Sequence, residues 1–165
     1  MISLSDMDKV EAFKGLNDSQ LELLQEKCKS VEFQRDDKLF SEGDKAEHLW
    51  IVVEGHVDLR FELPNDPNSH EDSTISTVES QSTRAKTLGW SCFIPPHKMR
   101  LSAYCVTRHC KVVRINKDEL IKLFDEDPSM GYKVMTYLIQ VLGFRFEQFQ
   151  EEVARDKGNS IMHSW

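Results

Sequence analysis

The order of hydrophobic and polar residues changes its period twice along the chain. Near the N-terminus, apolar side chains recur about every three residues, at Met7, Val10, Phe13 and Leu16. That spacing is typical of a helix with one buried face. Asn17 can cap a second helix that carries Leu21 and Leu24. We therefore predict N-terminal helices over about residues 5–30.

The middle of the chain, from about residue 31 to residue 115, has the alternation of β-strands. Val57, Leu59 and Phe61 alternate with polar residues, so one face of this strand is buried. Residues 49–53 are apolar throughout, as in a central strand. A surface loop is expected at residues 63–72, because Pro64 and Pro67 cannot continue a ladder. Further strands are expected near residues 39–44, 73–78, 101–106 and 111–115. Many short strands separated by turns predict a sandwich or a rolled barrel.

After Asn116 the period returns to about 3.6, which predicts helices over about residues 117–157. Asp127 followed by Pro128 is a typical helix start, and Gly158 is expected to end the last helix. Its apolar positions form one stripe, at Met135, Leu138, Leu142, Phe146, Phe149 and Val153. The simplest interpretation is that this stripe covers the β-strands. Its length also suits pairing with a second copy of the chain.

Composition limits the class of protein. A chain of 165 residues fits a single domain, here residues 1–165. Apolar residues make up 39% of the chain, but none of their runs approaches the roughly 20 residues that span a bilayer. The net charge of −7, with no basic face, argues against nucleic-acid binding. No basic and then apolar leader precedes Met7, so we expect a cytoplasmic protein without a membrane partner.

The cysteines and histidines offer two weak metal hypotheses. Four cysteines lack CxxC spacing and are expected to be buried thiols, although Cys105, His109 and Cys110 would suit a soft metal. His48, Glu54 and His56 share one strand parity around a glycine, as in metal-binding β-roll enzymes. The H-x-H pair of such enzymes is missing, and we find no catalytic motif. We therefore predict neither a metal, nor a cofactor, nor an enzyme.

A candidate anion site lies in residues 87–103. Gly89 marks a turn, and Arg100 follows eleven residues later at the start of a predicted strand. Backbone amides after the glycine, with a guanidinium across the loop, would form a cradle for an anion. Tyr104 could face either this site or the outer surface, and the pattern leaves both open.

The segment LFSEGDKAEHLWIVVEGHVDLRFE carries a family resemblance. Its Gly43, Asp44, Ala46, Gly55 and Val57 resemble the signature of the cyclic nucleotide-binding domain superfamily, and the chain resembles the bacterial CRP/FNR-like sensor domains within it. The resemblance implies an α+β fold: an antiparallel β roll of the double-stranded β-helix or jelly-roll type, with N-terminal helices and a long C-terminal helix. No helix-turn-helix follows, so we expect a stand-alone domain that does not bind DNA.

In that family, a Gly-Glu pair opens the phosphate-binding cassette, the glutamate holds the ribose hydroxyl, and an arginine pairs with the cyclic phosphate. Gly89 and Arg100 match, but Trp90 stands in place of the glutamate and the loop is one residue longer. An indole donates one hydrogen bond and accepts none. The resemblance therefore implies a site that keeps the phosphate half and has lost the sugar half. Its expected ligand is cyclic AMP, cyclic GMP or another small anion, held by Gly89, Trp90, Ser91, Cys92, Arg100, Leu101 and Ser102.

Two functions of different classes follow. The first is a non-catalytic, ligand-sensing regulatory domain that signals through its C-terminal helix, with a homodimer through that helix as its candidate assembly. The alternative is a protein-interaction or dimerisation module whose pocket has degenerated and binds nothing.

Overall fold

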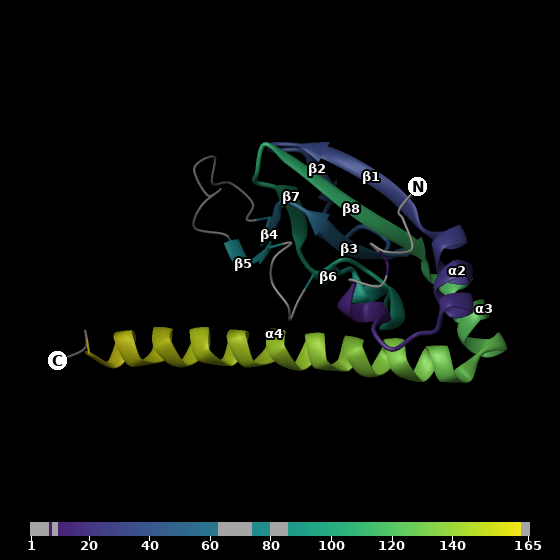
Figure 1. Ribbon diagram of the computed structural model, residues 1–165. Helices are drawn as coiled ribbons and strands as arrows, with labels where there is room; N and C mark the ends of the chain where they lie inside the picture. Colours follow the sequence, from purple (N-terminus) through teal and green to yellow (C-terminus); the bar gives the residue numbers. More distant parts are fainter. Residues whose placement is uncertain (1–6, 8–9, 63–73, 80–85, 163–165) are drawn as a thin grey trace.

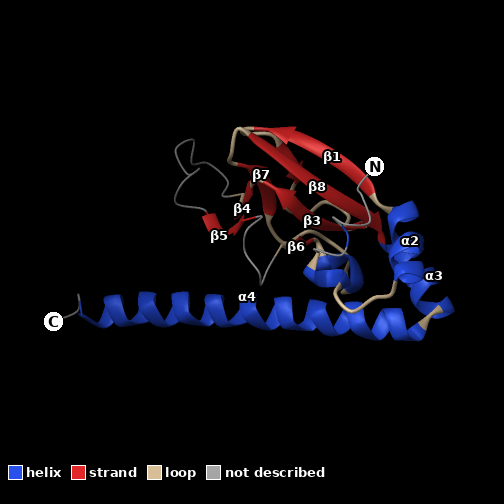
Figure 2. Ribbon diagram, viewed as in Figure 1, coloured by secondary structure: helices blue, strands red, loops and turns tan. Residues whose placement is uncertain are grey.

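The protein is a β roll with helices on one side and a long helix running beneath it (Figures 1 and 2). The structure, a computed structural model, describes residues 7, 10–62, 74–79 and 86–162. The expected antiparallel β roll with N-terminal helices and a long C-terminal helix is confirmed. The surface loop predicted at residues 63–72 lies outside the described residues.

The strands form two antiparallel sheets of four strands each in the described part of the chain. The first sheet has the order β1 (Lys29–Gln34), β8 (His109–Asn116), β3 (His48–Glu54) and β6 (Thr87–Leu88). The second has the order β2 (Lys38–Phe40), β7 (Ser102–Cys105), β4 (His56–Arg60) and β5 (Thr74–Glu79).

The helical elements are η1 (Glu11–Phe13), α2 (Asp18–Lys27), η2 (Trp90–Phe93), α3 (Lys117–Glu126) and α4 (Pro128–Met162). Asn17 caps α2 in a reciprocal pair with Gln20, and the Asn116 side chain accepts from the first amides of α3. Both caps agree with the start signals in the sequence. Within the described residues, no helix is long and apolar enough to cross a membrane.

Trp50 shows how the core is divided. Its ring contacts Phe33 of the first sheet and Phe40 of the second, at centroid distances of 6.5 and 5.8 Å, so it lies between the sheets. Its neighbours Leu49 and Ile51 are equally buried and must face the opposite side. One strand therefore supplies both the interior of the roll and the surface beneath the helices, which is why residues 49–53 are apolar throughout.

The N-terminal prediction was wrong at its C-terminal end. The second helix ends at Lys27, and β1 begins at Lys29, where half-buried Val31 and Phe33 alternate with exposed residues. The first predicted helix lies largely outside the described residues, but Met7 is helical, and a short 3-10 turn follows it before Gly15 at φ 81°. The two-residue strand β6 is too short to produce a periodic signal.

The expected single stripe of α4 is in fact two faces. Met130, Val134, Leu138 and Val141 are at most 5% exposed and pack on the core. Tyr132, Ile139 and Phe146 are 59–75% exposed. The first set is spaced by four, four and three residues and the second by seven, so Leu138 and Phe146 lie on different sides. The helix also continues to Met162, beyond its expected end near Gly158.

The first turn of α4 is anchored to the N-terminal segment. Asp127 Oδ1 accepts from the backbone amides of Ser129 and Met130, which caps the helix. Asp127 Oδ2 accepts from Gln20 Nε2 at 2.6 Å, and Lys133 Nζ donates to the carbonyl of Gly15 at 2.7 Å. The rest of the helix extends well past the roll (Figure 1).

Two glycines with the same backbone geometry test what the β3–β4 turn requires. Gly43 and Gly55 both have φ 84°, but a Cβ at Gly43 would meet nothing within 4 Å. At Gly55 it would overlap the carbonyl oxygen of His109 and approach Thr107 Oγ1 to 2.7 Å.

We expect Gly43→Ala to lower the free energy of unfolding by about 1–2 kcal/mol, the cost of a left-handed residue. Gly55→Ala should cost at least about 1 kcal/mol more, because the backbone must also move. Urea denaturation of both variants measures the difference, and equal losses would contradict a steric requirement at Gly55.

Candidate functional site

The turn after β6 is held directly against β3. Gly89 has φ 74°, in the left-handed region, and it precedes η2. A Cβ there would lie 2.6 Å from the carbonyl oxygen of His48 and 2.9 Å from Trp50 Cδ1. Both the backbone conformation and the close approach therefore require glycine. This fixes where η2 begins relative to the first sheet.

The far end of the same loop is tied to the Gly43–Asp44 turn. The Met99 amide donates to the Asp44 carbonyl at 2.8 Å, and the Gly43 amide donates to the Met99 carbonyl at 2.9 Å. His97, at φ 57°, places Nδ1 3.0 Å from the Cys92 carbonyl oxygen. The two motifs that the sequence singled out separately, the Gly-Asp turn and the Gly89 loop, thus form one unit.

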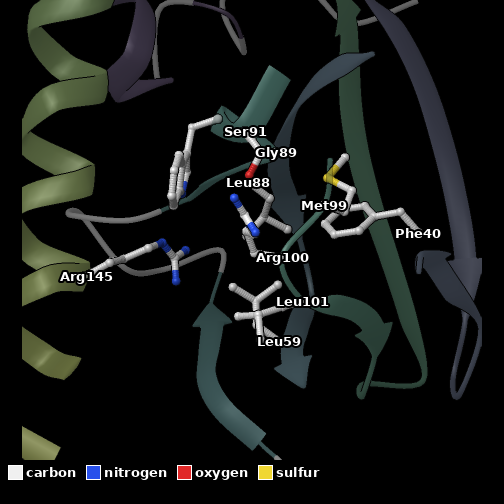
Figure 3. Close-up of a pocket in the computed structure, with 10 residues that line it drawn as sticks. Phe40, Leu59, Leu88, Gly89, Ser91, Met99, Arg100, Leu101 and Arg145 are labelled. Atoms are coloured by element: carbon white, nitrogen blue, oxygen red, sulfur yellow. The ribbon is translucent and has the colours of Figure 1, made fainter. Parts of the chain in front are cut away.

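A cavity of about 50 Å³ opens between this loop, the roll and α4 (Figure 3). Strands contribute some of its walls, the loop contributes most, and the long helix contributes one side chain. The lining residues are Phe40, Leu59, Leu88, Gly89, Trp90, Ser91, Met99, Arg100, Leu101 and Arg145.

Arg145 is the lining residue that the sequence analysis missed. It follows Val134, Leu138 and Val141 at helical spacing, so it continues the buried face of α4 with a cation. Figure 3 shows its side chain extending from the helix toward the loop. Burial lowers the pKa of the guanidinium to about 10, an effect that Tyr137 partly offsets. The side chain therefore stays protonated at neutral pH. The sequence did contain a signal for this residue, because Arg145 occurs at the helical spacing of the buried apolar residues Val134, Leu138 and Val141.

Five of the seven expected ligand-binding residues line the cavity: Gly89, Trp90, Ser91, Arg100 and Leu101. Cys92 and Ser102 do not. Cys92 is 1% exposed, and burial raises the pKa of its thiol to about 12. The Ser102 hydroxyl donates to Glu62 Oε1 at 2.5 Å and accepts from the Glu42 amide at 2.8 Å. Its hydrogen-bonding capacity is used in a different network.

That network also settles the orientation of Tyr104. Its hydroxyl donates to Glu62 Oε1 at 2.7 Å, and the Lys38 ammonium and Arg60 guanidinium lie 5.1 and 4.9 Å from the centre of its ring. Hydrogen bonds from Lys38, Ser102 and Tyr104 lower the pKa of Glu62 to about 2. Tyr104 thus belongs to a polar cluster on β7 and its neighbours and does not line the cavity.

The cysteines and histidines do not form the metal sites considered above. Among the described residues, no group of three or more His, Cys, Asp or Glu side chains could hold a metal ion. Cys105 and Cys110 form a disulfide, with Cα atoms 6.0 Å apart across the turn between β7 and β8. The expectation of four thiols was therefore wrong for this pair, because the turn between β7 and β8 places two cysteines five residues apart opposite each other. Cys28 and Cys92 are free.

Several solved structures have a similar fold. A protein named as a cyclic nucleotide-binding protein from Geobacter metallireducens is 25% identical, with a TM-score of 0.71 over 88% of this chain and 99% of that one. A cyclic nucleotide-binding domain from Methylobacillus flagellatus is 22% identical, with a TM-score of 0.72 over 92% and 81%. The catabolite activator protein of Thermus thermophilus is 17% identical, with a TM-score of 0.66 over 89% and 63%.

Comparison with curated proteins gave no match. The sequence itself, however, matches the family described as "Cyclic nucleotide-binding domain" over residues 30–127, from β1 to the residue before α4. This match takes in both sheets, the Gly-Asp turn and the whole Gly89 loop. The chain therefore belongs to the cyclic nucleotide-binding domain family.

Proposed function

We propose that this protein is a non-catalytic sensor that binds a small anion between Arg100 and Arg145 and transmits its presence through α4. Domains of the family have ligand-sensing, regulatory roles and are generally not catalytic. The anion and the route of the signal are the specific parts of the proposal.

The observation that carries the proposal is the placement of two arginines from different elements around one cavity. Arg100 comes from the loop and Arg145 from α4, and the ten lining residues include no aspartate or glutamate. Figure 3 shows Arg100 among the loop side chains, with Arg145 reaching in from the helix. An anion placed between two cations would gain charge-assisted hydrogen bonds from both.

Cyclic AMP and cyclic GMP are candidate ligands for the phosphate half of this site. The cyclic phosphate would pair with Arg100, as the resemblance to the family implies. Trp90 lines the cavity in the position where a glutamate would accept from the ribose. Among the described residues that line the cavity, only Ser91 has a side-chain oxygen acceptor, so the sugar has little to bind.

The route of the signal follows from Arg145. An anion bound by both arginines would tie α4 to the Gly89 loop through charge-assisted hydrogen bonds. A ligand shifts a conformational equilibrium only if it binds one state better than the other. Here the favoured state is the one that brings Arg145 close to the loop.

Removal of either arginine should weaken anion binding. We expect calorimetric titration with inorganic phosphate to show saturable binding to the wild type, and Arg100→Ala or Arg145→Ala to weaken it about tenfold to a hundredfold, since a hydrogen bond to a charged group contributes about 1.5–3 kcal/mol. Arg155→Ala is the matched control, because Arg155 is exposed on the same helix and does not line the cavity. Equal affinity in all four proteins would remove the cavity from the proposal.

A second candidate function, a dimerisation module, is favoured by the exposed face of α4. Tyr132, Ile139, Phe146 and Val153 are spaced by seven, and Met135, Leu142 and Phe149 fall three residues after the first three of them. This is the a and d pattern of a coiled coil. The exposed members range from 36% for Val153 to 75% for Tyr132. A second copy of α4 would cover this face from Tyr132 to Val153.

A charge placed in this seam should prevent pairing. We expect wild-type protein to show a concentration-dependent dimer in sedimentation equilibrium, and Ile139→Glu to be a monomer at the same concentrations, because each dimer would bury two carboxylates against apolar side chains. Gln140→Glu, an exposed neighbour outside the seam, should dimerise like the wild type. A monomeric wild type would rule out this second function.

The cellular location and the absence of nucleic-acid and membrane partners remain predictions.

A further inference from the structure

The walls between the two arginines are mostly apolar. Leu59, Leu88 and Met99 are 7%, 1% and 5% exposed. They line the cavity together with Phe40 and Leu101. These side chains come from both sheets and the loop, so the apolar wall is part of the roll interior. A ligand that reached both arginines would lie against it.

The polar groups that line the cavity can accept very little. Both arginines and the Trp90 indole are donors only, which leaves the Ser91 hydroxyl as the sole oxygen acceptor among the lining side chains that the structure describes. A ligand with several hydroxyl or amino donors would lose its hydrogen bonds to water without replacing them, at about 1–3 kcal/mol for each group. The site therefore suits a ligand whose polar atoms are concentrated in one acceptor group.

The size of the cavity points the same way. Its volume of about 50 Å³ corresponds to about four water molecules, at roughly 10–15 Å³ each by this measure. Four waters occupy about 120 Å³ of liquid, which is close to the size of one aromatic ring with a carboxylate. A nucleotide, with a base, a sugar and a phosphate, is more than twice as large, so much of it would lie outside this cavity in the solvent.

We propose that the anion recognised here is a compact organic carboxylate with an apolar body, of the aromatic monocarboxylate class, and not a nucleotide. This inference rests on the anion site proposed above. The carboxylate accepts from Arg100 and Arg145, and the ring packs against Leu59, Leu88 and Met99. Recognition then needs both halves of the ligand, the charge and the apolar surface.

Calorimetric titration of the full chain with five probes tests the inference. Benzoate carries both features, acetate lacks the ring, benzamide lacks the charge, and inorganic phosphate and cyclic AMP represent other anions. We expect benzoate to bind at least tenfold more tightly than each of the others, and to lose at least tenfold in Arg100→Ala and in Arg145→Ala.

A variant of the apolar wall gives a second readout. Leu101 is half-buried and lines the cavity, so Leu101→Asn should weaken benzoate binding severalfold more than it weakens phosphate binding. Leu23→Asn is the matched control, since Leu23 is 44% exposed on α2, away from the cavity. Thermal unfolding of both variants shows that they are folded under the conditions of the titration.

The outcomes separate this inference from the proposed function. If phosphate or cyclic AMP binds as tightly as benzoate, and that binding depends on both arginines, the anion site stands and the carboxylate class is wrong. The same conclusion follows if acetate equals benzoate or if Leu101→Asn changes nothing. If no anion shows binding that depends on the arginines, the proposed function fails along with the inference.

Discussion

The contact of Gly89 with β3 is the constraint on which the site depends. The turn can approach the His48 carbonyl and the Trp50 ring only because residue 89 has no side chain. Trp50 in turn contacts aromatic rings from both sheets. The packing of the roll interior therefore sets the position of the loop. The position of the loop in turn determines where Met99 and Arg100 lie. A shift in this one contact would change the shape of the cavity and the core together.

The long helix takes part in two surfaces at once. Residues 130, 134, 138 and 141 face the core, and Arg145 continues that face to the cavity. Ile139 and Phe146 face away from it. Because Arg145 adjoins Phe146 in sequence, a rotation of the helix about its axis cannot move one surface and leave the other in place. Under the proposed function, the rigid backbone of α4 would join the anion site to the exposed apolar face without a separate pathway of side chains.

The sequence predicted the parts of the structure that depend on local pattern. The strand alternation around Val57, the caps at Asn17 and Asn116, and the loop at Gly89 were all accessible in this way. It did not predict β1, whose half-exposed residues give a weak period, or the separation of α4 into two faces, since the apolar pattern of a helix does not show which of its residues pack on the core. Arg145 lies 45 residues from Arg100, and only the fold brings them to one cavity. The hydrogen bond of Ser102 to Glu62 could not be predicted either, because the two residues are 40 positions apart.

The anchoring of α4 at its first turn has a mechanical consequence. Gln20, Asp127 and Lys133 tie the start of the helix to the N-terminal segment, while the opposite end extends past the roll. At 1.5 Å per residue, Met162 lies about 48 Å along the axis from Met130. A tilt of only about 5° at the anchored end would displace the far end by about 4 Å over that length. The helix is thus a lever, in which a change too small to disturb the core becomes a displacement the size of a side chain.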